Sequence, residues 1–250
     1  MNIEIRQYSE LESTNKTAMN LAENGALEGT IVVAKEQVGG RGRLSRVWTS
    51  PKGGLWFSVI LRPHVSAEYI PQLTLLAGNA VVSSLRKIAR KDCIYIKWPN
   101  DVLWKDKKIC GILSEASFDD KGEFEYVVIG IGLNVNLQAD NFGNGLKNKA
   151  TSLALEMGQE YDIGHILSYV LKEIAIRYES WKKRLTEAVI PEWRYYNCTL
   201  GRLVDVKDGE TILAVGIAKQ ISPLGALEIE SDSGMASFNF GEVSIRNHNI

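Results

Sequence analysis

Apolar residues recur at helical spacing in three stretches of the chain. The first begins after Ser13 and Thr14, which are typical helix-capping residues, and Gly25 predicts where this helix ends. The second covers residues 71–90 and has a proline at its start, where a helix accepts one. The third covers residues 163–185. The pattern therefore predicts one short and two long amphipathic helices.

Runs rich in β-branched and aromatic residues predict strands between these helices. They cover residues 29–37, 56–62, 94–98, 108–118 and 123–136. The last two runs are joined by residues 119–122, whose Asp-Asp-Lys-Gly sequence is a good hairpin signal. Helices and strands together indicate an α+β fold class for this part of the chain.

The pattern changes after Pro191. Beyond it, short strand-like runs are separated by turn signals at residues 208–209 and 232–234. These runs are too few for a large sandwich but suit a small barrel. We therefore expect an α+β domain over residues 1–196, followed by a small all-β domain over residues 197–250.

The composition is that of an ordinary globular protein, with 45% hydrophobic and 24% charged residues among 250. The formal net charge is −1, so the chain has no overall field to attract a polyanion, and nucleic-acid binding would need a local basic patch. No apolar run approaches the roughly 18–20 residues that span a bilayer. The N-terminus also lacks the basic and apolar regions of a secretory signal. We expect a soluble, cytoplasmic protein without membrane contact.

Cysteine and histidine are sparse and scattered. The cysteines are Cys93, Cys110 and Cys198, and the histidines are His64, His165 and His248. Their spacing matches neither a disulfide framework nor a zinc site. We interpret the cysteines as small, partly buried apolar residues, and we expect neither a structural metal nor a histidine-based hydrolase.

The most informative segment is Gly-Gly-Arg-Gly-Arg at residues 39–43. Its glycines let the backbone approach a ligand closely, and its two arginines place fixed positive charge beside the exposed amides, which suits a phosphate or a carboxylate. The segment matches neither a Walker loop nor a dinucleotide fingerprint. A flexible turn or an RNA-contacting patch is the simpler alternative. Trp48 and the apolar strand that follows favour a loop tethered to a core.

A second segment, Lys-Trp-Pro-Asn-Asp at residues 97–101, predicts a turn that displays Asn100 beside Asp101. This pair could orient a cation or hold Mg²⁺ through water, although an Asx-type turn alone would explain it. Lys108 enters a strand shortly before Gly111. It either faces a pocket or protects a sheet edge from pairing.

A third segment places Gly130 and Gly132 on one face of a strand. Glycine weakens a strand interior unless a ligand or another backbone needs the space, so either a site or a tight crossing would explain the pair. Near the N-terminus, residues 13–16 formally match the SxxK of serine acylases. The other motifs of that class are missing, which leaves a helix cap with a ligand contact as the better interpretation.

Together and in this order, the segments closely resemble the biotin protein ligases. The matching pieces are Ser13-Thr14-Asn15, Gln37, Gly40-Arg41-Gly42-Arg43, Trp48, residues 97–101, Lys108, residues 111–113, residues 130–134 and residues 241–246. The resemblance covers essentially the whole chain. Because Met1 stands only twelve residues before Ser13, we expect no N-terminal winged helix-turn-helix and no DNA binding.

The resemblance implies a catalytic domain related to class II aminoacyl-tRNA synthetases, a mixed sheet with helices, followed by an SH3-like barrel. It also implies a two-step reaction. The carboxylate of biotin attacks the α-phosphorus of ATP to give biotinyl-5′-adenylate, and a lysine of a biotin carboxyl carrier protein then displaces AMP. ATP with Mg²⁺ would be required. Family members can dimerise through sheet edges, so a homodimer is an open option.

The resemblance also assigns roles to residues. Lys108, Arg41 and Arg43 would be catalytic, because cationic groups must neutralise both the carboxylate and the phosphate. The biotin-binding residues would be Ser13, Thr14, Asn15, Gln37, Gly40, Arg41, Lys108, Gly111, Gly130 and Gly132. The nucleotide-binding residues would be Arg43, Trp48, Asn134, Glu242 and Arg246, and Mg²⁺ would lie near Asn100 and Asp101. Residues 39–45 would close over the hydrolysis-prone adenylate.

Two other functions remain open at this point. A lipoate or octanoate ligase would share the fold and the adenylate chemistry, but the Gly-Arg-Gly-Arg and Lys-Trp-Pro-Asn-Asp segments are similar to the biotin branch. A nucleic-acid-binding regulator on the same scaffold gains weak support from the basic loop. The net charge of −1 opposes it.

Overall fold

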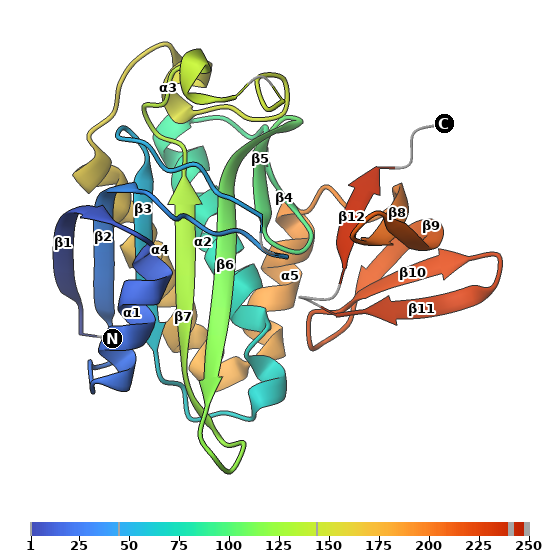
Figure 1. The fold of residues 1–250 in the computed structure, drawn as a ribbon. Coiled ribbons are helices and arrows are strands. Elements are labelled where there is room, and N and C mark those ends of the chain that lie inside the picture. Colours follow the sequence, from blue (N-terminus) through green and yellow to red (C-terminus); the bar gives the residue numbers. More distant parts are fainter. Residues whose placement is uncertain (1, 45, 144, 240–242, 248–250) are drawn as a thin grey trace.

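A computed structural model describes residues 2–44, 46–143, 145–239 and 243–247. The chain forms a large mixed sheet flanked by helices and, beside it, a small antiparallel sheet from the C-terminal residues (Figure 1). The α+β fold class with a following all-β part is therefore confirmed. The division at residues 196 and 197 stays a prediction. The structure ends its last helix at Tyr196 and begins the first strand of the small sheet at Leu203.

The large sheet has seven strands in the order β1-β2-β3-β7-β6-β5-β4. In chain order they are β1 (Glu4–Leu11), β2 (Thr30–Gln37), β3 (Leu55–Leu61), β4 (Ile94–Lys97), β5 (Asp101–Trp104), β6 (Lys107–Phe118) and β7 (Phe124–Leu133). Only β1 and β2 run parallel, and every other pair is antiparallel. The predicted hairpin at residues 119–122 joins β6 to β7, which cross the middle of the sheet (Figure 1).

Helices cover the two faces of this sheet unequally. The helical segments are α1 (Thr14–Glu23), η1 (Ala67–Tyr69), α2 (Gln72–Ala89), η2 (Ala139–Asn141), α3 (Leu153–Met157), α4 (Ile163–Arg184) and α5 (Thr186–Tyr196). Figure 1 shows α2, α4 and α5 together behind the sheet and α1 alone in front. The main contacts of α1 are with β2, β3 and β7.

Successive residues of a strand point to opposite faces of the sheet, so each strand contributes side chains to two separate cores. Val32, Ile60 and Val128 pack against Ala18 and Ala22 of α1. Their chain neighbours on the opposite face join the large core beneath α2 and α4. The large core lies between the sheet and α2 and α4, and the small one packs α1 onto the other face of the sheet.

The sequence missed one helix near Pro191. We expected the helical part to end there, but α5 runs through Pro191 to Tyr196. Proline removes one backbone hydrogen bond from a helix interior, which costs stability. Here the apolar face of α5 offsets that cost, because Val189, Ile190 and Trp193 are buried in the large core. Strands β1 and β5 were also missed, since neither shows a long apolar pattern.

The small sheet has five antiparallel strands in the order β11-β10-β9-β8-β12. Their bounds are β8 (Leu203–Asp208), β9 (Thr211–Ile221), β10 (Leu227–Ser231), β11 (Gly234–Phe238) and β12 (Ser244–Asn247). Two buried side chains of the large part hold it in place. Trp98 Nε1 donates to Gly225 O at 3.1 Å, and Gln72 Nε2 donates to Pro223 O at 2.9 Å.

Two further expectations can be compared with the structure. All three cysteines are free, with Cys110 buried and the other two half-buried, which agrees with their interpretation as small apolar residues. No helix within the described ranges has the length and apolar character to cross a membrane.

Candidate active site

A cavity of about 550 Å³ opens on the α1 side of the large sheet, where loops and the small sheet meet. Its floor is formed by β6 and β7, and the 40–49 loop and Ile245 of β12 contribute to its walls. The predicted site residues that line it are Ser13, Thr14, Asn15, Gln37, Arg41, Arg43, Trp48, Asn100, Asp101, Lys108, Gly111, Gly130, Gly132 and Asn134. Segments far apart in the sequence thus meet in one place.

One end of the cavity is neutral and extensively hydrogen-bonded. The N–H of Thr14 donates to Gln37 Oε1 at 2.7 Å, and Gln37 Nε2 donates to Ser50 Oγ at 2.8 Å. Ser58 Oγ lies 2.8 Å from Thr14 Oγ1 and 2.6 Å from Asn15 Oδ1, so its single proton serves one of the two. Since Ser58 is fully buried, these side chains are fixed by one another before any ligand arrives.

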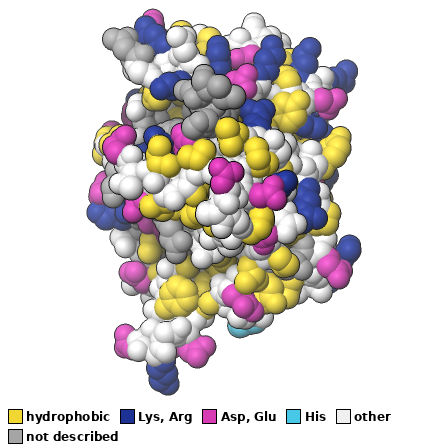
Figure 2. Space-filling view, turned by 90° about the vertical axis from the view of Figure 1, so that its right-hand side faces the viewer, with side chains coloured by type: hydrophobic (Ala, Val, Ile, Leu, Met, Phe, Trp, Pro, Cys, Tyr) yellow, Lys and Arg dark blue, Asp and Glu magenta, His cyan; other side chains and the backbone are white. Residues whose placement is uncertain are grey.

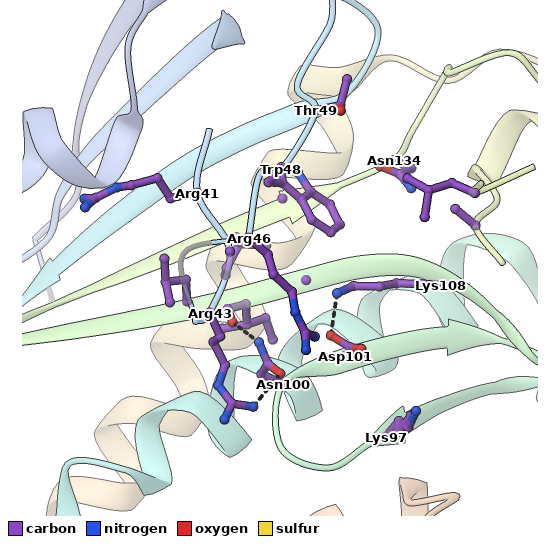
Figure 3. Close-up of a pocket in the computed structure, with 18 of the residues that line it drawn as sticks. Arg41, Arg43, Arg46, Trp48, Thr49, Lys97, Asn100, Asp101, Lys108 and Asn134 are labelled. Carbon is purple, nitrogen blue, oxygen red and sulfur yellow. Dashed lines mark hydrogen bonds and ion pairs between the residues drawn. The ribbon is translucent and has the colours of Figure 1, made fainter. Parts of the chain in front are cut away.

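The other end of the cavity collects charge. Lys108 Nζ lies 2.5 Å from Asp101 Oδ1. Arg43 Nη1 donates to Asn100 Oδ1 at 3.3 Å, and Arg43 Nη2 donates to the carbonyl of Val243 at 2.7 Å. Burial lowers the pKa of Arg43, and the Asp101 carboxylate opposes this effect, so the guanidinium remains charged. Figure 3 shows these side chains converging below Trp48.

Two glycines on neighbouring strands allow Trp48 to lie against the sheet. Gly111 of β6 is paired with Gly132 of β7, so both open toward the same face. A Cβ on Gly132 would lie 2.5 Å from Trp48 Nε1, and one on Gly111 would lie 3.0 Å from Trp48 Cζ3. Lys108 Nζ lies 4.8 Å from the centre of the indole ring, which is a cation–π distance. Among the residues that the structure describes, the buried indole N–H has no hydrogen-bond partner.

Gly130 has a different neighbour from the one we expected. The resemblance suggested that it leaves space for biotin. A Cβ there would lie 2.1 Å from Asn15 Oδ1, so the space is already used by a side chain of the wall. Gly40 is similarly crowded, because its Cβ would meet the carbonyl of Trp48 at 2.3 Å. Both glycines therefore let parts of the chain approach each other closely.

The glycine- and arginine-rich segment folds back on itself above the cavity. The N–H of Gly42 donates to Arg46 O at 2.7 Å, and the N–H of Trp48 donates to Gly40 O at 2.9 Å. Arg41 points away from the charged cluster, and its Nη2 lies 3.3 Å from Glu115 Oε1 (Figure 3). Arg46 instead points toward Lys108 and Asp101 (Figure 3). Sequence reasoning gave Arg46 no role, although it lies only three residues after this segment.

Asn134 is buried beside the cavity with its amide already engaged. Its Nδ2 donates to the carbonyl of Thr151 at 2.9 Å. Its predicted contact with the nucleotide would use the side-chain oxygen or the second hydrogen of Nδ2. Glu242 lies outside the described residues, as does the side chain of Arg246, so their predicted nucleotide contacts stay predictions.

The predicted magnesium residues differ in how well they fit a metal. Both amide atoms of Asn100 are engaged, because its Oδ1 accepts from Arg43 and its Nδ2 donates to Ile112 O at 2.6 Å. Asp101 and Asp106 present carboxylates to the same cavity. Within the described part of the chain, no group of three or more His, Cys, Asp or Glu side chains could hold an ion. The residues thus fit Mg²⁺ that arrives on a nucleotide, because protein-bound Mg²⁺ often uses one or two carboxylates plus substrate phosphates.

Two protein-family models match the chain. That of the biotin/lipoate A/B protein ligase family matches residues 8–134, and that of the biotin protein ligase C terminal domain matches residues 199–246. The chain belongs to the biotin/lipoate A/B protein ligase family. The resemblance found in the sequence is thereby confirmed, and the second match distinguishes the biotin protein ligases within this family.

Individual relatives agree with this membership. The bifunctional ligase/repressor BirA of Bacillus spizizenii is 38% identical over 94% of this chain and 72% of its own length. The biotin–[acetyl-CoA-carboxylase] ligase of Paracoccus denitrificans is 32% identical over 93% of this chain and 96% of its own length. The biotin protein ligase of Aquifex aeolicus, solved with biotin and ATP, superposes with a TM-score of 0.84 at 30% identity, covering 98% of this chain and 99% of the other.

Proposed function

We propose that this ligase activates biotin as biotinyl-5′-adenylate and transfers it to one lysine of a biotin carboxyl carrier protein. The observation that carries the proposal is the division of a single cavity into a neutral, hydrogen-bonded end and a cationic end. A ureido ring is neutral and needs both donors and acceptors, whereas an acyl phosphate forms from two anions. The cavity offers both environments side by side.

In the first step, a carboxylate oxygen of biotin forms a bond to the α-phosphorus of ATP, and the bond from that phosphorus to the leaving pyrophosphate breaks. Lys108 would hold the carboxylate and stabilise the charge that develops at phosphorus. It must first exchange its Asp101 partner for substrate, because its ammonium group lies 2.5 Å from that carboxylate. Arg43 and Arg46 would neutralise the phosphates.

In the second step, the amine of the acceptor lysine attacks the acyl carbonyl. The new C–N bond replaces the C–O bond to AMP, and the nitrogen loses a proton. Asp101 lies beside Lys108 in the cavity, and its carboxylate would accept the proton that the nitrogen loses. The carrier protein as acceptor is suggested by the Paracoccus relative, whose name is that of a biotin–[acetyl-CoA-carboxylase] ligase.

ATP would lie across the charged end of the cavity, with Trp48 available to stack on adenine once the loop has closed. Mg²⁺ would travel with the phosphates near Asp101 and reduce their charge. Ser13, Thr14 and Gln37 would contact the ureido ring. Closure of residues 39–45 and the absence of DNA binding stay predictions, and a homodimer stays an open option.

The test is to incubate the purified protein with MgATP and, in separate reactions, biotin, lipoate or octanoate. Mass spectrometry then identifies the acyl-adenylate. We expect biotinyl-adenylate from biotin and none from the other two acids. An adenylate from lipoate or octanoate would move the substrate assignment to the other branch of the family. No adenylate from any acid, in protein that melts cooperatively, would contradict the proposed reaction.

A further inference from the structure

Glu115 of β6 lies behind the wall of the cavity, yet it contacts two residues that line the cavity. Its Oε2 accepts a hydrogen bond from Asn15 Nδ2 at 2.6 Å. Its Oε1 lies 3.3 Å from Arg41 Nη2. Glu115 does not itself line the cavity, and its side chain is 26% exposed. One carboxylate thus joins the start of α1 to the loop above the cavity.

The contacts of Asn15 show why this carboxylate matters for the neutral end. Asn15 Nδ2 also donates to the carbonyl of Leu113 at 3.2 Å, and its Oδ1 lies 2.6 Å from Ser58 Oγ. Two acceptors on one side and a hydroxyl donor on the other fix the orientation of the amide. Because all its polar atoms are engaged, Asn15 forms a fixed part of the cavity wall and holds the neighbouring Thr14 in place.

The contact with Arg41 anchors one end of the loop. Arg41 pairs with Val47 as an isolated β-bridge, so fixing the Arg41 side chain also fixes the two paired segments of the loop. Arg43, two residues further along the loop, reaches Asn100 and Val243 at the charged end of the cavity. The loop is therefore held at two points, one on each end of the cavity.

We propose that Glu115 is a positioning residue for biotin: it holds Asn15 and Arg41 so that the neutral end of the cavity is complete before the substrate arrives. The proposal rests on the proposed function and deepens it. Glu115 touches no reacting atom and acts through its two partners. Its loss loosens the biotin end of the loop and leaves the ATP end, held by Arg43, in place. Biotin binding and retention of the adenylate are then weakened, and ATP binding is preserved.

The experiment compares Glu115→Gln with Glu125→Gln. Glutamine keeps the size of the side chain but loses the charge that attracts Arg41. Glu125 lies on the same hairpin and is exposed, where it accepts from Ser117 Oγ at 3.3 Å, so its variant is a matched control for the loss of one carboxylate. Steady-state rates give KM for biotin and for ATP, and release of biotinyl-adenylate from enzyme without carrier protein measures retention.

For Glu115→Gln we expect KM for biotin to rise about tenfold, the size of effect that follows the loss of one charge-assisted hydrogen bond. Release of the adenylate should accelerate, and KM for ATP should change less than about twofold. Glu125→Gln should match wild type in every measurement. An unchanged KM for biotin in Glu115→Gln, or an equal rise in both KM values, would overturn the proposal.

A double-mutant cycle with Arg41→Gln separates positioning from general destabilisation. If Glu115 acts through Arg41, Glu115→Gln raises KM for biotin much less in the Arg41→Gln background than in wild type. Fully additive effects would overturn this route. Should Glu115→Gln melt without a cooperative transition, Glu115→Asp decides the matter, because its shorter side chain cannot keep the contacts with both Asn15 and Arg41. It must then reproduce the rise in KM for biotin and the faster release of the adenylate.

Failure of this inference is distinguishable from failure of the proposed function. Wild-type protein in the same assay either forms biotinyl-adenylate or does not, and only the second outcome contradicts the function itself. With an active wild type, the Glu115 and Arg41 variants test positioning alone.

Discussion

The two ends of the cavity are built from different interactions, and they place different demands on the substrate. At the neutral end, Thr14, Asn15 and Ser58 are almost fully buried and bonded to one another. At the charged end, Lys108 and Asp101 remain about one-third exposed and neutralise each other at 2.5 Å. The protein's own hydrogen bonds at the first end are formed before biotin arrives, whereas an anionic substrate must replace an ion pair at the second.

This difference indicates where recognition and reaction occur. Hydrogen bonds fixed before binding favour selection of one ring system, because the ordering of these side chains has already taken place on folding. The ion pair between Lys108 and Asp101 keeps the lysine charged and in place while no substrate is bound. It opens when an anionic substrate arrives. The same cavity can thus be selective at one end and reactive at the other.

The largest effect is expected at the charged end, from Lys108→Ala. Loss of the cation that stabilises charge at phosphorus should reduce adenylate formation about 10²–10³-fold. Lys107→Ala is the matched control, because Lys107 is the exposed neighbour on the same strand. Single-turnover formation of biotinyl-adenylate measures both variants. If Lys108→Ala and Lys107→Ala formed the adenylate at equal rates, Lys108 would have no role in the reaction. The distinction between a neutral and a reactive end would then be wrong.

Substitutions of Arg43 test whether the adenylate is retained only when the 40–49 loop is bound to the charged end of the cavity. Arg43→Ala should release free biotinyl-adenylate faster, about tenfold or more, because the contacts with Asn100 and Val243 are lost. Arg43→Lys keeps the charge, but its single ammonium group cannot contact both partners at once. It should therefore release the adenylate at a similar rate. Labelling of an unrelated protein by escaped adenylate provides the measurement. Retention equal to that of wild type in Arg43→Ala would contradict this role.

A substitution of Gly132 tests how much space the floor of the cavity has between its neutral and its charged end. An added methyl group would lie 2.5 Å from Trp48 Nε1, so Gly132→Ala must displace the indole. We expect biotin to bind about tenfold more weakly, because overpacking of this kind costs about 1–3 kcal/mol. Gly143→Ala is the control, since a Cβ there meets nothing within 4 Å. Calorimetric titration with biotin tests both, and unchanged affinity in Gly132→Ala would show that the floor tolerates bulk.

The smallest effect on activity is expected from a charge network far from the cavity. Burial would raise the pKa of Glu173, but hydrogen bonds from Lys87 and Arg177 prevail and lower it to about 2. Because the folded-state pKa lies below the unfolded value of about 4.3, this carboxylate stabilises the fold above that pH and loses the contribution as pH falls toward 2.

Glu173→Gln should therefore lower the urea midpoint at pH 7 and narrow the difference between pH 7 and pH 3, with KM and kcat unchanged. A pH dependence identical to that of wild type would contradict the assigned pKa. A change in KM for biotin would show that the two regions are not independent.

The sequence predicted the main elements of the fold because their signals are local. Residues 71–90 and 163–185 carry the helical periodicity that became α2 and α4. The strands from residues 29–37 and 108–118 correspond to β2 and β6. Helix α5 could not be predicted in this way, because burial of Trp193 and its neighbours against other helices outweighs Pro191, and that burial depends on tertiary contacts.

The residues of the site likewise fall into those that the sequence predicted and those that it did not. Motif residues such as Lys108 and Arg43 stand out in the sequence because glycines and charges accompany them. Glu115 and Ser58 do not, because no motif surrounds them and their hydrogen-bond partners lie far away in the chain. Their importance follows from the pairing of strands and the placement of α1, which only the structure shows. The resemblance also could not predict that Asn15 fills the space over Gly130.

The most direct test of the division between the two ends compares biotin with its primary amide, which keeps the ring system but lacks the negative charge. Calorimetry without ATP gives the affinity of wild type and Lys108→Ala for both ligands. We predict that Lys108→Ala weakens biotin about tenfold, by loss of one charged contact, and changes the affinity for the amide less than about twofold. Equal weakening of both ligands would contradict the account, because Lys108 would then support the neutral end as well.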